Sequence, residues 1–450
     1  MPGGGGLLQL VAQGKQDLFL TGNPQITWFK MVYRRYTNFA IESQPMYFDG
    51  DPDFGKRLTC TIPRRGDLLG PMYLEVVLPY IQLTDGTPVA YVNSTGHALI
   101  EEISLEIGEQ EIDKQTGEWM EIWSELSTPS SKRDGFNNMI NRADGLLVPP
   151  ESDPIFDFTT STSGSGYQYG SVKMYIPLQF WFNKNPGLYL PLLAMQYHPI
   201  RINLKLRPLQ DMFYTPLLAF APACGGPQVK PVKIIDIRLW GDYVYLDTEE
   251  RRRFVANTHE YLIEQIQYTP ALSIGKDIFS QQVRLEFNHP IREMIWRIQR
   301  DRMLATHEYF NFSSTSVSDV GVTRDMLQDA VIQVDGYDRF ERRDAGYFRL
   351  VQPYQYHTSV PTKTFLYSYS FSLRPEEMQP TGSLNASRID NMSLQISLRP
   401  DYPGPLQIPG QTATNPNYVP ARGEANIRVY AKNHNVLRVV NGFAGLLFKI

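Results

Sequence analysis

Seven histidines are the side chains of this sequence best suited to hold a metal ion or to move protons near neutral pH. They stand at His97, His198, His259, His289, His307, His357 and His434. No two form an H-x-H or H-E-x-x-H pattern, and Cys60 and Cys224 offer no C-x-x-C pair. We therefore expect no metal site. His198 and His289 flank strand-like segments, so we expect them to have structural roles.

Other catalytic patterns are also missing from the sequence. It contains no G-x-S-x-G elbow, no G-x-x-x-x-G-K-[ST] phosphate loop and no G-x-G-x-x-G fingerprint. Adjacent carboxylates, such as Glu101 and Glu102 or Glu249 and Glu250, suit solvation or helix capping better than a tuned acid and base. The sequence therefore predicts no catalytic residue and no cofactor, and we expect that the protein is not an enzyme.

Two arginines between two tyrosines form the most basic aromatic motif, MVYRRYTNF, with Arg34 and Arg35 at its centre. Such a motif can grip a nucleic-acid strand by charge and stacking. In alternating, extended backbone the two arginines point to opposite faces, which favours pairing with carboxylates between subunits or domains. Residues 1–27 hold only one lysine and one aspartate, so this segment lacks the dense positive charge of a nucleic-acid-binding arm.

Four N-x-[ST] sequences match the acceptor pattern for N-linked glycans. They begin at Asn93, Asn311, Asn385 and Asn391, and the first two lie in loop-like sequence. The pattern is short enough to occur by chance. The N-terminal sequence also lacks the basic region, long apolar core and cleavage site of a secretory signal, so host-type glycosylation is not expected to follow from it.

The composition favours a soluble protein with many short strands. There are 23 Phe and 26 Tyr, with 33 Gly and 33 Pro, and the net charge is −4. Aromatic residues suit strands, Gly and Pro suit turns, and so small a net charge draws the chain to neither nucleic acid nor an anionic membrane. Two cysteines and the lack of a run of about 18 apolar residues lead us to expect a reducing compartment and no membrane span.

Alternation of apolar and polar residues recurs along the chain, as in strands with one buried face. Helical patterns are scarce, and the clearest is DTEERRRF. Asp247 or Thr248 can cap it, two glutamates follow in the first turn, and three arginines lie in the last turn, where each charge favours the helix dipole. We predict a short connecting helix there.

Four strand-like blocks occur twice in the same order, which indicates a tandem duplication. Leu58, Cys60 and Ile62 match Val283, Leu285 and Phe287; Leu105 and Ile107 match Ile332 and Val334; Ile202, Leu204 and Leu206 match Leu394, Ile396 and Leu398; and Ile237–Trp240 match Ile427–Tyr430. The separation falls from 225 (58 to 283) to 190 (237 to 427), so the first copy carries about 35 extra residues. The stretch 125–171 is rich in Ser, Thr, Gly and Pro, and we predict that it forms a long loop.

Two β domains of about 200 residues account for this duplication. Periodicity alone leaves open a jelly roll, another sandwich or a barrel. Several segments, however, resemble the major capsid proteins of large icosahedral DNA viruses of eukaryotes, above all those of algal viruses. These segments lie at 10–42 (LVAQGKQDLFLTGNPQITWFKMVYRRYTNFAIE), 185–206, 242–267, 346–355 (GYFRLVQPYQ), 387–395 and 427–446 (IRVYAKNHNVLRVVNGFAGL).

The resemblance implies an all-β fold of two tandem eight-stranded jelly rolls, whose homotrimer forms a pseudo-hexagonal capsomer. We expect an N-terminal arm at 1–27, a first jelly roll at 28–247, a connecting helix at 248–256, and a second jelly roll with the C-terminal tail at 257–450. A six-fold outline made from three duplicated chains can tile a flat face with only three-fold symmetry. The expected function is to form the icosahedral shell of a large double-stranded DNA virus.

The arm is predicted to be an assembly device, because its apolar residues Leu7, Leu8, Leu10, Leu18 and Leu20 fold best against a partner. By resemblance, we expect it to lie beneath the capsomer and to contact neighbouring trimers and minor capsid or penton proteins. The same resemblance implies an internal membrane between shell and genome, no direct genome contact, glycans on outward loops, and assembly in the virus factory of the host cytoplasm.

Two other functions remain open from the sequence. One is a carbohydrate-binding or carbohydrate-modifying double β domain, which the abundant Tyr and Trp would serve. The other is a minor virion or scaffold protein of similar fold.

Overall fold

The computed structural model describes residues 4–84, 89–142, 171–214, 228–314, 325–362, 364–399 and 424–448. The chain divides into two units, Met1–Asn38 and Phe39–Ile450. In the first unit, helices α1 (Gly4–Val11) and α2 (Lys15–Thr21) precede a stretch without regular structure. The Gly14 N–H donates to Asp17 Oδ2 at 2.9 Å, which caps α2.

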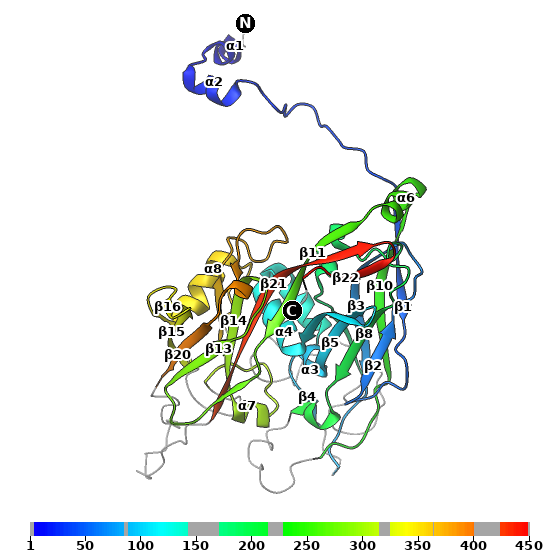
Figure 1. The fold of residues 1–450 in the computed structure, drawn as a ribbon, viewed down its shortest axis with the longest axis vertical. Coiled ribbons are helices and arrows are strands. Elements are labelled where there is room, and N and C mark those ends of the chain that lie inside the picture. The colour runs from blue at the N-terminus through cyan, green and yellow to red at the C-terminus, as the bar shows by residue number, and fades with distance from the viewer. Residues whose placement is uncertain are drawn as a thin grey trace. The chain divides into compact units, whose positions relative to one another are not determined.

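Two antiparallel sheets face each other in the earlier part of the second unit, which we call the first barrel (Figure 1). One sheet has the order β1-β10-β3-β7, made of β1 (Phe39–Met46), β10 (Asp236–Leu246), β3 (Leu68–Leu78) and β7 (Val172–Pro177). The other has the order β2-β8-β5-β6, made of β2 (Arg57–Thr61), β8 (Ile200–Leu206), β5 (Ile100–Ile107) and β6 (Gln110–Thr116). A small ribbon pairs β4 (Ala90–Tyr91) with β9 (Phe213–Tyr214).

A second pair of sheets forms the second barrel. One sheet has the order β11-β21-β14-β18, made of β11 (His259–Tyr268), β21 (Ala425–Val440), β14 (Pro290–Arg300) and β18 (Leu366–Ser370), and is extended by β12 (Leu272–Ile274), β19 (Leu384–Asn385) and β22 (Phe443–Leu446). The other has the order β13-β20-β15-β16, made of β13 (Ser280–Leu285), β20 (Met392–Leu398), β15 (Leu327–Val334) and β16 (Tyr337–Asp338), with β17 (Arg343–Asp344) also paired to β15.

The two barrels share one strand order, position by position, so the duplication read from the sequence is present as two copies of one topology. The register agrees at the centre, where Leu105 pairs with Ile202 and Ile332 pairs with Leu394. The first matched block is displaced, however, because Cys60 is the residue that pairs with Ile202, whereas Val283 pairs with Leu394. A shift of two residues leaves the alternating pattern unchanged, so the sequence could not detect this error.

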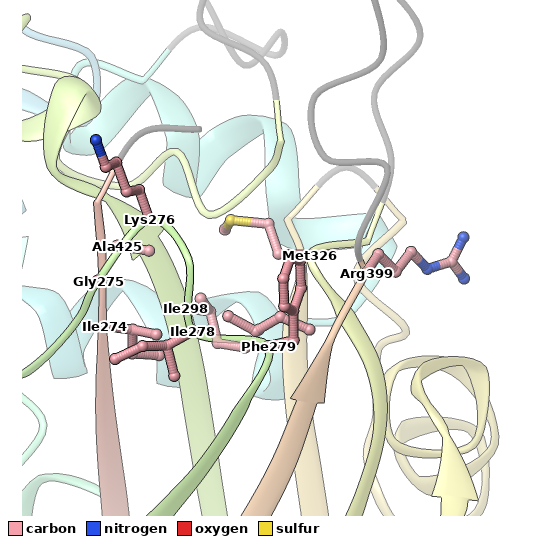
Figure 2. A pocket seen from close by; sticks show the side chains of 10 residues that line it. Ile274, Gly275, Lys276, Ile278, Phe279, Ile298, Met326, Arg399 and Ala425 are labelled. Atoms are coloured by element: carbon pink, nitrogen blue, oxygen red, sulfur yellow. The ribbon is translucent and has the colours of Figure 1, made fainter. Parts of the chain in front are cut away.

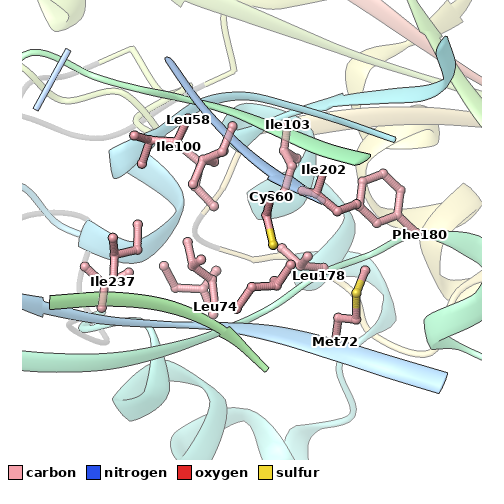
Figure 3. Packing of buried hydrophobic residues seen from close by; sticks show 14 of the residues in the cluster. Leu58, Cys60, Met72, Leu74, Ile100, Ile103, Leu178, Phe180, Ile202 and Ile237 are labelled. Carbon is pink, nitrogen blue, oxygen red and sulfur yellow. The ribbon is translucent and has the colours of Figure 1, made fainter. Parts of the chain in front are cut away.

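The apolar face of each sheet supplies a barrel core. In the first barrel, Cys60 and Ile202 from one sheet point toward Leu74 and Met72 from the other, and all four side chains are buried (Figure 3). Each fully buried aliphatic side chain of this kind contributes about 1.5–3 kcal/mol. The first core also takes in residues from β11, β21 and β22: Ile263, Leu437, Val439 and Ala444.

Helices occupy part of the stretch that the sequence predicted as a long loop. Helix α4 (Gly117–Ser127) runs into it and α5 (Ser130–Met139) lies inside it, so the loop prediction was wrong there, while 143–170 lie outside the described residues. Ser and Pro are favoured at helix starts as well as in loops, and here Pro129 holds the N-cap position of α5. The remaining short helices are α3 (Thr95–Leu99), η1 (Trp181–Asn183), η2 (Pro186–Leu188), η3 (Leu209–Asp211), α7 (Asp301–Ala305), η5 (Tyr347–Val351), α8 (Gln352–Tyr356) and η6 (Ala386–Arg388).

Between the barrels, helix α6 (Thr248–Ala256) occupies the stretch in which the capping pattern predicts a helix. The Asp247 side chain accepts a hydrogen bond from the Thr248 N–H at 2.7 Å. Arg251 also forms an ion pair with Asp67 at 2.8 Å, and this contact ties the connecting helix to the first barrel.

Candidate functional site: the seam between the barrels

Helix α4 of the first barrel covers the outer face of the β11-β21-β14-β18 sheet of the second, and we call this contact the seam. The Thr116 side chain starts the helix by accepting the Trp119 N–H at 3.1 Å. The apolar residues of the contact form one buried cluster that also includes Phe312 and Phe365: Trp119, Ile122, Trp123, Leu126, Ile295, Leu366 and Tyr430. The Trp119 and Tyr430 rings lie 5.4 Å apart between centroids. The seam is therefore packed as a core, and it fixes the two barrels to each other.

Charged residues border this apolar cluster. Glu118, in the first turn of α4, forms ion pairs with Arg297 of β14 and, at 3.4 Å, with Arg428 of β21. Burial alone would raise the pKa of Glu118, but the two arginines outweigh it and lower that pKa. The carboxylate thus stays ionised and bridges two strands of the partner barrel.

A second charged group lies deeper in the seam and centres on Glu264 of β11. Its carboxylate accepts from Lys184 at 2.9 Å, lies 3.2 Å from the Lys432 ammonium, and pairs with Arg292. The Arg292 guanidinium also donates to the carbonyl oxygens of Pro375 and Glu377. One buried anion therefore meets three cations.

The three cations around one carboxylate determine the pKa shifts in this group. Burial alone would raise the pKa of Glu264, but Lys184, Lys432 and Arg292 together hold it well below its usual range. Burial and the two neighbouring cations lower the pKa of Lys432, although Glu264 opposes this shift. Lys432 also lies 3.8 Å from the centroid of the Trp123 ring, a cation–π contact that partly replaces its lost water.

Also in the second barrel, His357 pairs with two further carboxylates. Its Nε2 lies 3.2 Å from Glu293 and its Nδ1 lies 3.2 Å from Glu376. Burial lowers its pKa, but the two carboxylates outweigh burial and raise the pKa to about 9. The stability that this pairing contributes is present below pH 6.5 and is lost as the pH rises toward 9.

His434 lies near the same group but is held neutral. It is buried on β21, and neither ring nitrogen has a hydrogen-bond partner among the described residues. Burial, assisted by Arg292 and Lys432 and opposed by Glu264, lowers its pKa to about 4.

Acid is therefore expected to destabilise the protein through His434. The unfolded chain, with a His pKa of 6.5, binds more protons than the folded chain between pH 6.5 and 4, so stability is lost as the pH falls through that window. The loss should reach about 1–2 kcal/mol at pH 5. Thermal unfolding at pH 7 and pH 5 checks this: the variant His434→Leu should lose less stability on acidification than the parent protein. Equal losses in both proteins would contradict the assignment.

The other histidines lie in separate structural contacts. His198 Nδ1 lies 2.9 Å from the Ala444 carbonyl oxygen and so links the first barrel to β22, whereas His289 has a positive φ of 64° at a turn before β14. The buried His97 lies 2.6 Å from Glu121, which also pairs with Arg142. Among the described residues, no group of three or more His, Cys, Asp or Glu could hold a metal ion.

The edge of the seam and the second barrel each contain a cavity. One, of about 320 Å³, lies at the edge of the seam, but Glu118, one of its charged lining residues, already pairs with two others, Arg297 and Arg428. The other, of about 30 Å³, lies in the second barrel where Ile274, Ile298 and neighbouring side chains converge (Figure 2). It has room for about one water molecule, far less than an organic ligand needs.

The tryptophans, which a carbohydrate-binding function would need at the surface, are mostly internal. Trp119, Trp123, Trp181 and Trp296 are buried, and Trp240 is half-buried. Among the described helices, none is long and apolar enough to cross a membrane.

The predicted assembly residues all lie in the first unit. Leu7, Leu8, Leu10, Leu18 and Leu20 are exposed on α1 and α2. Arg34 and Arg35 lie in the irregular stretch before β1, so the strand geometry assumed for them was wrong. Regular β structure begins only at Phe39, later than the expected start of the first jelly roll at 28.

The four candidate glycosylation sites differ in exposure. Asn385 and Asn391 are exposed and Asn93 is half-buried. Asn311 was placed in a loop by its sequence, but it is only 2% exposed and its amide donates to Glu308 at 2.6 Å. A buried, hydrogen-bonded amide is not accessible to a glycosyltransferase in the folded protein.

The charged residues of the seam were missed by sequence reasoning. Lys184, Glu264, Arg292 and Lys432 come from four separate segments, so no local spacing reveals them. One signal was available: β21 carries Lys432 and His434 in the middle of a strand that is otherwise rich in apolar residues. A charge at such a position needs a partner, because an unpaired buried charge is very costly.

Comparisons with known proteins agree along the whole chain. The family model described as the major capsid protein N-terminus matches residues 27–247, and the model of the large eukaryotic DNA virus major capsid protein matches residues 250–445. The major capsid protein of Pyramimonas orientalis virus is 38% identical, and that of Phaeocystis pouchetii virus is 36% identical. Each alignment covers 99% of both chains.

Solved structures give the same result. A chain of the PBCV-1 virus capsid superposes with a TM-score of 0.71 at 30% identity, covering 94% of this chain and 100% of that chain. The Faustovirus major capsid protein superposes with a TM-score of 0.72 at 14% identity, covering 95% and 94% of the two chains, which shows a shared fold. The predicted fold class, two tandem jelly rolls, is thereby confirmed.

Proposed function

Because this chain belongs to the major capsid proteins of large eukaryotic DNA viruses, and so forms the virion shell, we propose that it does so as a homotrimeric, pseudo-hexagonal capsomer. The observation that carries the proposal is the identical strand order of the two barrels, joined by a packed seam. Three chains built in this way offer six similar barrels around a three-fold axis. Flat arrays of such tiles can cover an icosahedral face.

The solution mass of the purified protein tests the trimer. Light scattering coupled to size exclusion should find three times the single-chain mass of 51.6 kDa, over a range of protein concentrations. A monodisperse species of 51.6 kDa at high concentration would contradict the proposal.

We further propose that the arm, residues 1–27, joins capsomers to neighbouring trimers and to minor capsid or penton proteins. Its exposed leucines support this role, since such residues gain stability only by burial against a partner. With Lys15 and Asp17 as its only charged side chains, the arm offers no strong attraction to a genome. This supports an arrangement in which minor proteins and an internal membrane lie between the shell and the genome. Assembly in the virus factory of the host cytoplasm belongs to the same proposal.

The shell role needs no catalysis, and we propose that the protein is not an enzyme. For glycans, exposure favours Asn385 and Asn391 over Asn93, and burial argues against Asn311. The mass of the intact protein purified from virions, compared with 51.6 kDa, would reveal any glycan.

A further inference from the structure

The seam is a contact between two unlike surfaces, a helix and a sheet. The helix, α4, follows the edge strand β6 of the first barrel, and the sheet face belongs to β11-β21-β14-β18 of the second. Because the barrels share one topology, each barrel has both kinds of surface, a helical segment and an outer sheet face. The seam uses one of each, so among the described residues the sheet face of the first barrel and the helical segment of the second have no such counterpart.

The sheet face left over is the outer side of β1-β10-β3-β7, and the strand registers identify its residues. Trp240 pairs with Tyr73 as Tyr430 pairs with Ile295 in the second barrel. One step along, Glu75 pairs with Tyr175 as Arg297 pairs with Leu366. Trp240, Tyr73 and Tyr175 therefore hold the positions of Tyr430, Ile295 and Leu366, which α4 buries in the seam.

These three aromatic side chains form a row across the face. The Trp240 and Tyr73 rings are stacked, with centroids 6.2 Å apart, and Tyr175 meets Tyr73 edge to face at 6.1 Å. Tyr175 is exposed, and the other two are half-buried. Their equivalents in the second barrel are buried, whereas this row stays partly exposed in the single chain.

The helical segment left over is η5 with α8, residues 347–356. It follows β16 and β17 as α4 follows β6, and Phe348 anchors it in the second core. Three apolar side chains nevertheless stay exposed on it: Leu350 at 39%, Val351 at 40% and Tyr354 at 79%. Tyr354 follows Val351 by three residues and Leu350 by four, the two spacings that make side chains neighbours on an α-helix. In Figure 1, α8 and the β1-β10-β3 strands lie on opposite sides of the second unit.

We infer that the exposed side of η5–α8 docks on the Tyr73–Tyr175–Trp240 row of a second copy of this chain, in the same manner as α4 docks on its sheet. The inference rests on the proposed trimer and adds which surfaces form it. A contact between unlike surfaces repeats head to tail and closes into a ring when its rotation divides the circle. Aromatic residues at the centre of an interface usually dominate its affinity, so both surfaces should be sensitive to single changes.

Charge placed on either surface tests the inference. The variants Tyr354→Asp and Tyr175→Asp each place a carboxylate in the docked contact, and each should shift the mass from that of three chains to the 51.6 kDa of one, at concentrations where the parent is trimeric. Both residues are exposed in the single chain, so neither change should unfold the monomer. The control Val255→Asp makes the same change on exposed α6, outside both surfaces, and should remain trimeric.

Mixing the two variants gives a sharper test. The intact helical segment of Tyr175→Asp can still meet the intact row of Tyr354→Asp, so the mixture should form a dimer, with twice the single-chain mass of 51.6 kDa, that neither variant forms alone. Variants that keep the trimer mass, or a Val255→Asp control that dissociates with them, would overturn the inference. A monomeric parent protein would instead overturn the proposed trimer itself.

Discussion

The substitution Glu264→Gln is expected to lower the free energy of unfolding by about 3–5 kcal/mol, because it removes the one carboxylate that Lys184, Lys432 and Arg292 share. The amide keeps the shape of the side chain but not its charge. The buried cations Lys432 and Arg292, and the more exposed Lys184, would then face one another without that carboxylate. Removing one partner of a buried ion group is strongly destabilising, because it leaves the remaining charges buried and unpaired.

Chemical denaturation of the parent and of Glu264→Gln at pH 7 measures the difference. The matched control is Glu260→Gln on the same strand, whose ion pair with Arg438 is exposed and should contribute no more than about 1 kcal/mol. If Glu264→Gln and Glu260→Gln unfolded at the same denaturant concentration, the buried charge group would have no special role in joining the barrels.

Removal of residues 1–27 is expected to abolish shell assembly and to leave the trimer intact. The arm lies outside the compact unit that holds both barrels, so its loss removes neither core nor seam. Mass measurement should still find three truncated chains per particle, while electron microscopy under assembly conditions should find no shells. Truncated trimers that build normal shells would refute the assembly role.

A full-length variant tests whether assembly needs the apolar side chains of the arm or only the presence of this segment. Changing Leu7, Leu8, Leu10, Leu18 and Leu20 to serine should block assembly as deletion does, because these exposed side chains supply the apolar area. Changing Gln9, Gln13 and Gln16 to serine alters the same segment without that loss, and such trimers should still assemble.

The barrels could be predicted from the sequence because their signal is periodic. Alternation at Leu105 and Ile107 survives in β5, and the Ile237–Trp240 match falls on β10 and β21, which occupy equivalent places. Capping chemistry likewise points to α6, since Asp247 satisfies a backbone N–H that the first turn leaves free. Such signals are local, and each is written in a few consecutive residues.

Features that depend on distant partners could not be predicted in this way. Helix α4 carries apolar residues on the side that faces the other barrel, and Glu264 meets cations from three other segments. The burial of Asn311 follows from Glu308 and the surrounding chain, and an N-x-[ST] pattern contains no information about that. Composition also misled at α5, where a Ser-rich start looked like a loop.

The core of the first barrel is not complete until late in the synthesis of the chain. Leu437, Val439 and Ala444 pack into it, yet a ribosome makes them only after almost the whole second barrel, long after β10, the last strand of the first. A nascent or prematurely terminated chain therefore leaves the core open and lacks the strand that carries Lys432. Completion of the first barrel core therefore waits for β21 and β22, the last strands of the second barrel.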